Sequence, residues 1–130
     1  MQTPSRFILI DDDFCSNRIG RTFIKKMYPH VEVLDFESPL QALQYVDNTC
    51  AGDFASTAIL LDINMPELNG WQVLEKLQEL PSSKKECLTI FMLSSSIDPR
   101  DKQKADEHVL ISGYIEKPLS REILYKLFGG

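Results

Sequence analysis

The chain has 130 residues, of which 43% are hydrophobic and 25% are charged, which is the length and composition of one ordinary globular domain. The formal net charge of −5 argues against nucleic-acid binding, which needs an excess of Lys and Arg on one face. The sequence lacks both an apolar run of the roughly 20 residues that span a bilayer and the layout of a signal peptide. We therefore expect a cytoplasmic protein that binds neither nucleic acid nor membrane.

Residues 6–10 form a short apolar run that predicts a first strand, which ends in Asp11-Asp12-Asp13. A helix follows, with Pro29 as its stop and one apolar face made by Ile19, Phe23, Ile24 and Met27. Residues 31–36 alternate sufficiently between apolar and polar side chains to predict a strand nearer the sheet edge. Residues 38–41 read as a capping box with Pro at the first helical position, which predicts a helix with Leu40, Leu43 and Val46 inward. Residues 47–56 predict a polar loop.

The apolar run 58–62 ends in Asp62 and predicts a strand buried on both faces, the pattern typical of a parallel sheet. After a loop with Pro66 and Gly70, a helix follows with a buried stripe of Val73, Leu74, Leu77 and Leu80. Residues 81–86 predict a charged loop. Residues 88–93 predict a second fully apolar strand, which leads into Ser94-Ser95-Ser96.

Asp98 and Pro99 predict the start of a helix that reaches about residue 108. This helix is polar almost all round, which core packing alone does not explain. Residues 109–115 predict a fifth strand, followed by Glu116-Lys117-Pro118. Ser120 then caps a last helix with Ile123, Leu124, Leu127 and Phe128 inward.

Five βα repeats predict an α/β fold, a doubly wound five-stranded parallel sheet with helices on both faces. The first strand and the two most apolar strands belong in its centre, which favours the strand order 2-1-3-4-5. In that order strands one, three, four and five are neighbours. Their carboxyl ends meet at one sheet edge, where ligands bind in folds of this class.

The residues at these strand ends predict a phosphoryl-binding site: Asp11, Asp12, Asp62, Ser94 and Lys117. Three close carboxylates cannot all stay ionised without a cation, and Mg²⁺ is the natural one for oxygen ligands. A lysine and a hydroxyl then suit phosphoryl oxygens, and a carboxylate can itself attack phosphorus.

Each of these residues alone has a plainer interpretation. The aspartates could be strand ends, turns or a helix N-cap region, the serine a turn, and the lysine a solvated loop charge. The presence of compatible residues at four strand ends favours the phosphoryl site. The three cysteines, Cys15, Cys50 and Cys87, are scattered and odd in number, which predicts reduced thiols.

From residue 7 to residue 128 the chain resembles the receiver domains of two-component response regulators. The motifs that carry the resemblance are Ile10-Asp11-Asp12-Asp13, Leu61-Asp62-Ile63-Asn64-Met65-Pro66 with Gly70, Met92-Leu93-Ser94-Ser95-Ser96, and Tyr114-Ile115-Glu116-Lys117-Pro118. The resemblance implies a flavodoxin-like receiver fold in which residues 1–130 form a single domain, with a core of about 6–128 and no output domain.

The resemblance also implies a role for each site residue. Asp62 is the phosphoacceptor. Mg²⁺ is held by Asp11, Asp12, Asp62 and the backbone carbonyl of Asn64, with Asp12 as a direct ligand, while Asp13 opens the first helix. Lys117 and Ser94 act in catalysis, Ser94 and Tyr114 form the switch, and Asn64 and Ser96 tune the lifetime of the phosphorylated state. The Lys117–Pro118 bond is expected to be cis.

The expected partner is a sensor histidine kinase or a histidine phosphotransfer protein. A downstream protein is expected on the face made by the helix at 98–108, the fifth strand and the last helix, and phosphorylation-dependent dimerisation stays open. Such a domain catalyses its own phosphorylation and dephosphorylation but is a signalling domain rather than an enzyme.

Three alternatives compete with this interpretation. A haloacid-dehalogenase-like phosphatase would use Asp11 as nucleophile, but the chain lacks a cap insertion and a late pair of metal-binding acids. A flavodoxin-like FMN module needs a hydroxyl-rich and glycine-rich loop after the first strand, where this chain has acids. A receiver fold used only as an interaction module is disfavoured by the intact set of site residues.

Overall fold

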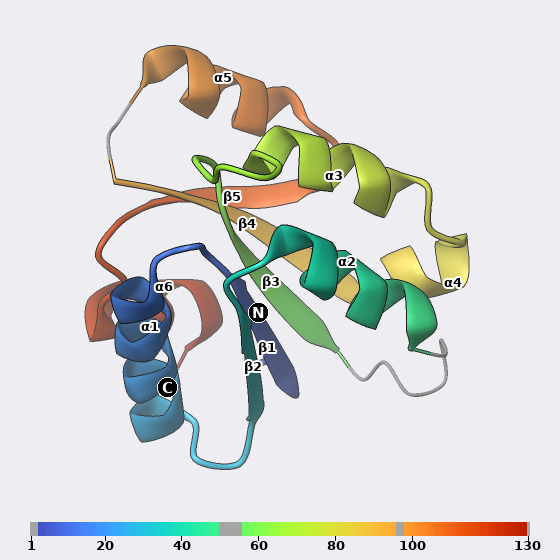
Figure 1. The fold of residues 1–130 in the computed structure, drawn as a ribbon. Coiled ribbons are helices and arrows are strands. Elements are labelled where there is room, and N and C mark those ends of the chain that lie inside the picture. The colour runs from blue at the N-terminus through green and yellow to red at the C-terminus, as the bar shows by residue number, and fades with distance from the viewer. Residues whose placement is uncertain (1–2, 50–55, 96–97, 130) are drawn as a thin grey trace.

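The computed structural model describes residues 3–49, 56–95 and 98–129, and within these ranges five parallel strands form one sheet (Figure 1). The strands are β1 (Arg6–Ile10), β2 (Glu32–Phe36), β3 (Thr57–Asp62), β4 (Leu88–Ser94) and β5 (Ile111–Glu116). Their order is β2-β1-β3-β4-β5, which confirms the predicted topology and the edge position of β2.

Helices cover both faces of the sheet (Figure 1). On one face α1 (Phe14–Met27) and α6 (Arg121–Phe128) enclose a cluster that includes Phe7, Leu60 and Phe91. On the other face α2 (Pro39–Asn48), α3 (Gly70–Gln78) and α5 (Pro99–Glu107) enclose a cluster that includes Ile59 and Leu61. A further short helix, α4 (Ser82–Lys85), precedes β4.

Strand β3 is buried along its whole length, as its apolar sequence predicts. Alternate residues contribute to the two clusters, since Ala58 and Leu60 pack under α1 and α6 while Ile59 and Leu61 pack under α2 and α3. This double burial fixes the strand's register, because a slip of one residue would reverse every side chain. Asp62 is therefore held at the carboxyl end of the best-buried strand.

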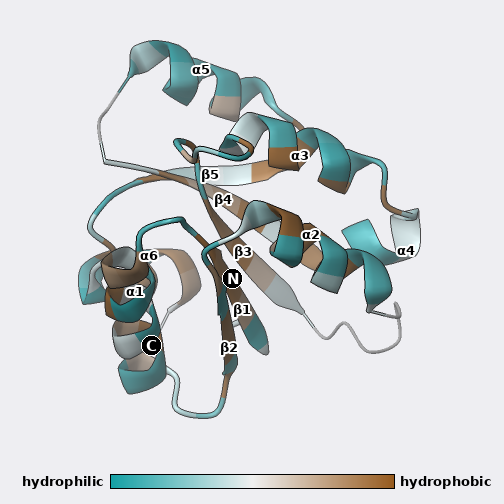
Figure 2. Cartoon of the chain, in the orientation of Figure 1, coloured by the Kyte–Doolittle hydropathy of each residue, from teal (hydrophilic) through white to brown (hydrophobic). Residues whose placement is uncertain are grey.

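The helix starts follow the predicted caps. The Asp98 side chain accepts a hydrogen bond from the Arg100 amide ahead of Pro99, and Ser120 accepts one from the Ile123 amide. Helix α5 is hydrophilic almost throughout, and Ala105 is its buried residue (Figure 2). No helix in the described ranges is long and apolar enough to cross a membrane.

The prediction that Leu40 lies inward is wrong, and the apolar face predicted for the first helix is only partly buried. Leu40 is 52% exposed and Ile19 is 44% exposed. With Ser38 as the N-cap, the phase of α2 turns Ala42 and Val46, four residues apart, toward the sheet and leaves Leu40 outside.

The predicted loop at 81–86 contains the single helical turn α4 and is therefore also corrected. The amides of Lys84 and Lys85 donate to the Pro81 carbonyl, and Lys84 Nζ donates to the carbonyls of Val46 and Asp47 at the end of α2. This contact between distant segments stabilises a turn that local sequence alone leaves open.

Two element boundaries also differ from prediction. Helix α2 continues to Asn48 into the predicted loop, whose residues 50–55, with Cys50, lie outside the described ranges. Strand β5 begins at Ile111 because the Ile111 amide donates to the His108 carbonyl in a turn, which leaves Val109 89% exposed. The thiols of Cys15 and Cys87 are free, as expected.

Candidate functional site

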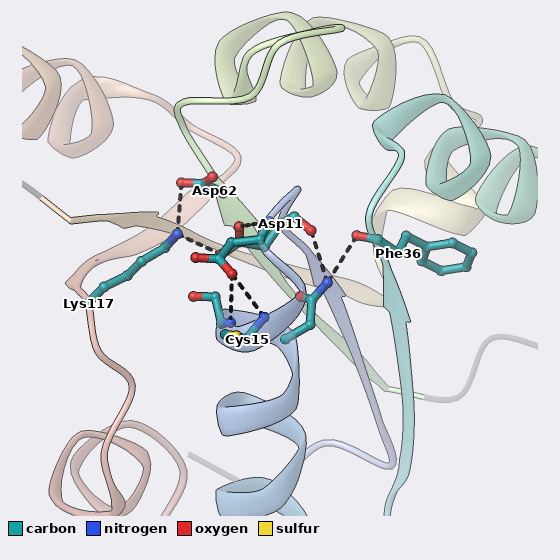
Figure 3. A network of polar contacts seen from close by, with 8 residues as sticks. Asp11, Cys15, Phe36, Asp62 and Lys117 are labelled. Atoms are coloured by element: carbon teal, nitrogen blue, oxygen red, sulfur yellow. Dashed lines mark hydrogen bonds and ion pairs between the residues drawn. The ribbon is translucent and has the colours of Figure 1, made fainter.

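Three carboxylates meet where β1 and β3 end, and Figure 3 shows two of them, those of Asp11 and Asp62. Asp11, Asp12 and Asp62 each offer one oxygen, and these oxygens all lie within 4.8 Å of one another. Asp11 and Asp62 are buried, at 2% and 4% exposure, whereas Asp12 is exposed and opens the cluster to solvent. The structure thus brings together the acids that the strand ends predict.

Lys117 lies against this cluster from the end of β5 (Figure 3). Its Nζ is 2.6 Å from Asp11 Oδ2 and 3.3 Å from Asp62 Oδ1. The Lys117 amide donates to the Ser94 carbonyl at 2.8 Å, which attaches its backbone to the end of β4. The Lys117–Pro118 peptide bond is cis, as expected.

Burial and charge shift the proton affinity of both partners. Burial, with the repulsion of Asp11, raises the pKa of Asp62 to about 6, although Lys117 and the Asn64 backbone amide oppose the rise. Burial lowers the pKa of Lys117, but its bonds to Asp11 and Asp62 outweigh burial and raise that pKa above its ordinary value. Lys117 is therefore a cation, and Asp62 titrates just below neutral pH.

The turn between β1 and α1 orients the first two acids. Asp11 Oδ1 accepts a hydrogen bond from the Asp13 amide at 2.9 Å. The Asp13 side chain accepts from the amides of Cys15 and Ser16 and so caps α1, as expected. The third acid of the triplet is thus engaged by the helix, outside the carboxylate cluster.

Three further predicted site residues lie in the described ranges: Ser94, Tyr114 and Asn64. Ser94 is 1% exposed at the end of β4, and Tyr114 is partly buried against the hydrophobic cluster under α2, α3 and α5. Asn64 is exposed, and its backbone amide bonds to the Asp62 carboxylate. Ser96 lies outside the described residues.

Asn17, a buried polar residue beside the site, is not among the site residues predicted from the sequence. Its Nδ2 donates to the Asp11 carbonyl at 2.9 Å and to the Phe36 carbonyl at 3.4 Å. A usable signal was present, because Asn17 occupies the same helix face as the buried Gly20 and Ile24, where an apolar residue is the rule.

Gly70 supports the site from the first turn of α3. A Cβ at this position would lie 2.7 Å from the Asp62 carbonyl oxygen and 2.9 Å from Ile63 Cα, both backbone atoms that cannot move aside cheaply. The Gly70 amide also donates to the Ile63 carbonyl at 2.8 Å. Close backbone packing here needs a residue without a side chain.

We expect Gly70→Ala to lower the free energy of unfolding by about 2–3 kcal/mol, because an added methyl group must push β3 and α3 apart. Gly20→Ala is the matched control, since its Cβ would meet only the flexible Leu9 and Leu119 side chains, the nearest at 3.2 Å. Urea denaturation measures both variants. Equal stability of the two would contradict the close packing at Gly70.

The donor set fits a hard divalent cation. Three carboxylate oxygens within reach of one ion, open to solvent at Asp12, match the oxygen ligands and retained waters that Mg²⁺ prefers. Two of the acids are buried, so a cation relieves a repulsion that Lys117 balances only in part.

Metal affinity should weaken as the pH falls. Because a ligand carboxylate must be ionised and Asp62 has a pKa of about 6, protons compete with Mg²⁺ below that pH. We expect calorimetric titration at pH 5.0 to give an affinity about tenfold weaker than at pH 7.5, since one unit below the pKa leaves about one carboxylate in ten ionised. The same affinity at both values would contradict ligation by Asp62.

A model of the response regulator receiver domain family matches residues 7–128. The chain belongs to this family. This receiver domain is 32% identical over 108 residues to the two-component response regulator ARR15 of Arabidopsis thaliana, in an alignment that covers 78% of this chain and 51% of that protein. It is 29% identical over 112 residues to the cyclic di-GMP phosphodiesterase response regulator RpfG of Xanthomonas campestris pv. campestris, covering 86% of this chain and 28% of that protein. The chain thus spans about half of the first relative and a smaller part of the second.

Solved structures agree with the family. A two-component response regulator from Cytophaga hutchinsonii superposes on the receiver domain with a TM-score of 0.86 and 32% identity, covering 97% of this chain and 95% of that one. A response regulator receiver protein from Dyadobacter fermentans gives a TM-score of 0.83 and 29% identity, covering 96% and 98%. Family and fold together favour the signalling domain over the phosphatase and FMN alternatives.

Proposed function

We propose that this receiver domain accepts a phosphoryl group from a phosphohistidine onto Asp62. The observation that carries the proposal is the position of Asp62, which ends the central strand β3, forms a carboxylate cluster with Asp11 and Asp12, and lies 3.3 Å from the Lys117 ammonium. The donor would be a sensor histidine kinase or a histidine phosphotransfer protein.

In this reaction a carboxylate oxygen of Asp62 attacks phosphorus, and the bond from phosphorus to the donor's imidazole nitrogen breaks. With a pKa of about 6, most Asp62 side chains are ionised and nucleophilic at pH 7.5. Lys117, already bonded to Asp62, remains beside the new phosphoryl oxygens and balances their charge. Ser94 supplies a hydroxyl donor from the end of β4.

Mg²⁺ would be held by Asp11, Asp12, Asp62 and the Asn64 carbonyl, and would supply neutralising charge to the phosphoryl oxygens. Water later attacks the aspartyl-phosphate to restore the carboxylate and release inorganic phosphate. Asn64 and Ser96 would set how readily that water enters.

The signal would leave through the face made by α5, β5 and α6. Tyr114 on β5 and Ser94 on β4 are the proposed switch residues, and they belong to neighbouring strands, in which Tyr114 is in register with Met92 and Ser94 with Glu116. A second connection reaches α5 from the first turn of α3, because the Trp71 indole donates to Asp101 at 3.2 Å and Lys104 Nζ lies 4.5 Å from the Trp71 ring centroid. A downstream protein, or a second copy of this domain, would bind there.

Incubation with phosphoramidate and Mg²⁺ tests which residue is modified, because its P–N bond resembles that of phosphohistidine. Borohydride reduction then converts the acyl phosphate into a stable alcohol that peptide mapping can locate. We expect the change at Asp62. Modification of Asp11 would support the phosphatase alternative.

A further inference from the structure

We propose that Asn17 is a positioning residue of this site, whose buried amide sets where the Asp11 and Asp12 carboxylates meet a metal ion. The inference rests on the proposed function, because the same metal site serves phosphoryl transfer. It concerns a residue on α1 that does not itself contact the phosphoryl group.

The Asn17 side chain is buried and makes specific hydrogen bonds. It is 4% exposed, and burying an amide is costly unless its hydrogen bonds are made. Its Nδ2 reaches two backbone carbonyls from different strands, Asp11 at the end of β1 and Phe36 at the end of β2 (Figure 3). The Phe36 carbonyl also accepts the Asp11 amide at 3.1 Å, so one amide group joins α1, β1 and β2.

The bond to the Asp11 carbonyl controls both acids at once. That carbonyl belongs to the planar peptide group that joins Asp11 to Asp12, so fixing its oxygen fixes the plane from which the Asp12 backbone starts. On the Asp11 side, the carboxylate is bonded to the Asp13 amide and to Lys117. Asn17 thereby completes a set of bonds that orients the two acids relative to each other.

Asn17 also borders the same small cavity as Asp11 and Lys117, a space of about 30 Å³ beside the ion pair. Removing the amide would enlarge this space and free the peptide plane to rotate. Outer partners of metal ligands change metal affinity by roughly 10–100-fold when mutated. A similar loss is the expected signature of positioning by Asn17.

Calorimetric titration with Mg²⁺ at pH 8 tests the inference on the full chain without any phosphodonor. We expect Asn17→Ala to bind Mg²⁺ about tenfold more weakly than the wild type. Asn17→Asp keeps the shape but turns acceptor oxygens toward two carbonyls, so we expect weaker binding there too. The direction of the change in Mg²⁺ affinity is informative for Asn17→Asp, because an added negative charge by itself would strengthen Mg²⁺ binding.

Tyr28→Phe is the control for a purely structural effect. The Tyr28 hydroxyl also donates to two backbone carbonyls, the buried one of Leu124 and the partly buried one of Gly129, but lies outside the carboxylate cluster. We expect this variant to lose stability and keep the wild-type Mg²⁺ affinity. If Asn17→Ala fails to fold, Asn17→Ser takes its place. Serine supplies a hydroxyl donor instead of the amide, so we expect an intermediate Mg²⁺ affinity.

Unchanged Mg²⁺ affinity in the folded Asn17 variants, or an equal loss in Tyr28→Phe, would overturn the inference. Stronger binding by Asn17→Asp would do the same. A wild-type domain that binds Mg²⁺ but takes up no phosphoryl group would refute the proposed function and leave the role of Asn17 intact. Absence of Mg²⁺ binding by the wild type would overturn both.

Discussion

Replacing Lys117 with methionine is expected to destabilise the metal-free domain by about 2 kcal/mol at pH 7.5. The variant leaves Asp11 and Asp62, both buried, without the ammonium that lies 2.6 Å and 3.3 Å from their oxygens. Removing one partner of a buried ion pair costs roughly 3–5 kcal/mol, and the exposed Asp12 side of this site admits water that reduces the cost. We also expect phosphoryl uptake to slow by about 100-fold, since Lys117 balances developing charge.

Urea denaturation in EDTA measures the first effect, with Lys102→Met on the exposed side of α5 as the control. The loss should shrink at pH 5, because Asp62 then takes up a proton that replaces the missing positive charge. It should also shrink when Mg²⁺ is added at pH 7.5. A variant as stable as wild type in EDTA would contradict the ion pairing seen at the site.

Asp62→Asn is expected to stabilise the metal-free domain by about 2 kcal/mol at pH 7.5 while abolishing phosphoryl uptake. The folded pKa of Asp62, about 6, is above its ordinary value of 3.8, so the folded state binds this proton more tightly than the unfolded state. The corresponding stability is fully present below about pH 3.8 and is lost as the pH rises through about 6. Asparagine is neutral throughout and avoids that loss.

Thermal melts in EDTA across pH 4–8 test this prediction, beside Asp106→Asn as a control for lost charge on an exposed helix position. The wild type should lose stability relative to Asp62→Asn between about pH 4 and pH 6.5. At higher pH, Mg²⁺ should reduce the difference in stability between the two proteins. If the free energies of unfolding of the two proteins changed in parallel with pH, burial and Asp11 would not raise the pKa of Asp62, and the prediction would be wrong.

The sequence was sufficient to predict the strand order of the sheet and the location of the candidate site. Strand β3 follows from an unbroken apolar run, and topology then places Asp11, Asp62 and Lys117 at one edge, because parallel strands end together. The helix caps at Asp98 and Ser120 are local signals that the structure confirms. These features depend on patterns of neighbouring residues, which can be recognised in a single sequence.

Features that depend on contacts between distant segments could not be predicted in the same way. The exposure of Leu40 depends on the phase of α2 against the sheet, and α4 depends on the bonds of Lys84 to the end of α2. One hydrogen bond of the Asn17 side chain goes to the Phe36 carbonyl, which is 19 residues away in the sequence. Such contacts exist only once the strands are assembled.

Intact-mass measurement after incubation with a small phosphodonor tests the central claim most directly. The wild type and Asp62→Asn would each be measured with Mg²⁺ and with EDTA. We predict one added phosphoryl group on the wild type in Mg²⁺ alone, and none on Asp62→Asn in either condition. An unmodified wild type in Mg²⁺, or an equal adduct on Asp62→Asn, would contradict phosphoryl transfer to Asp62.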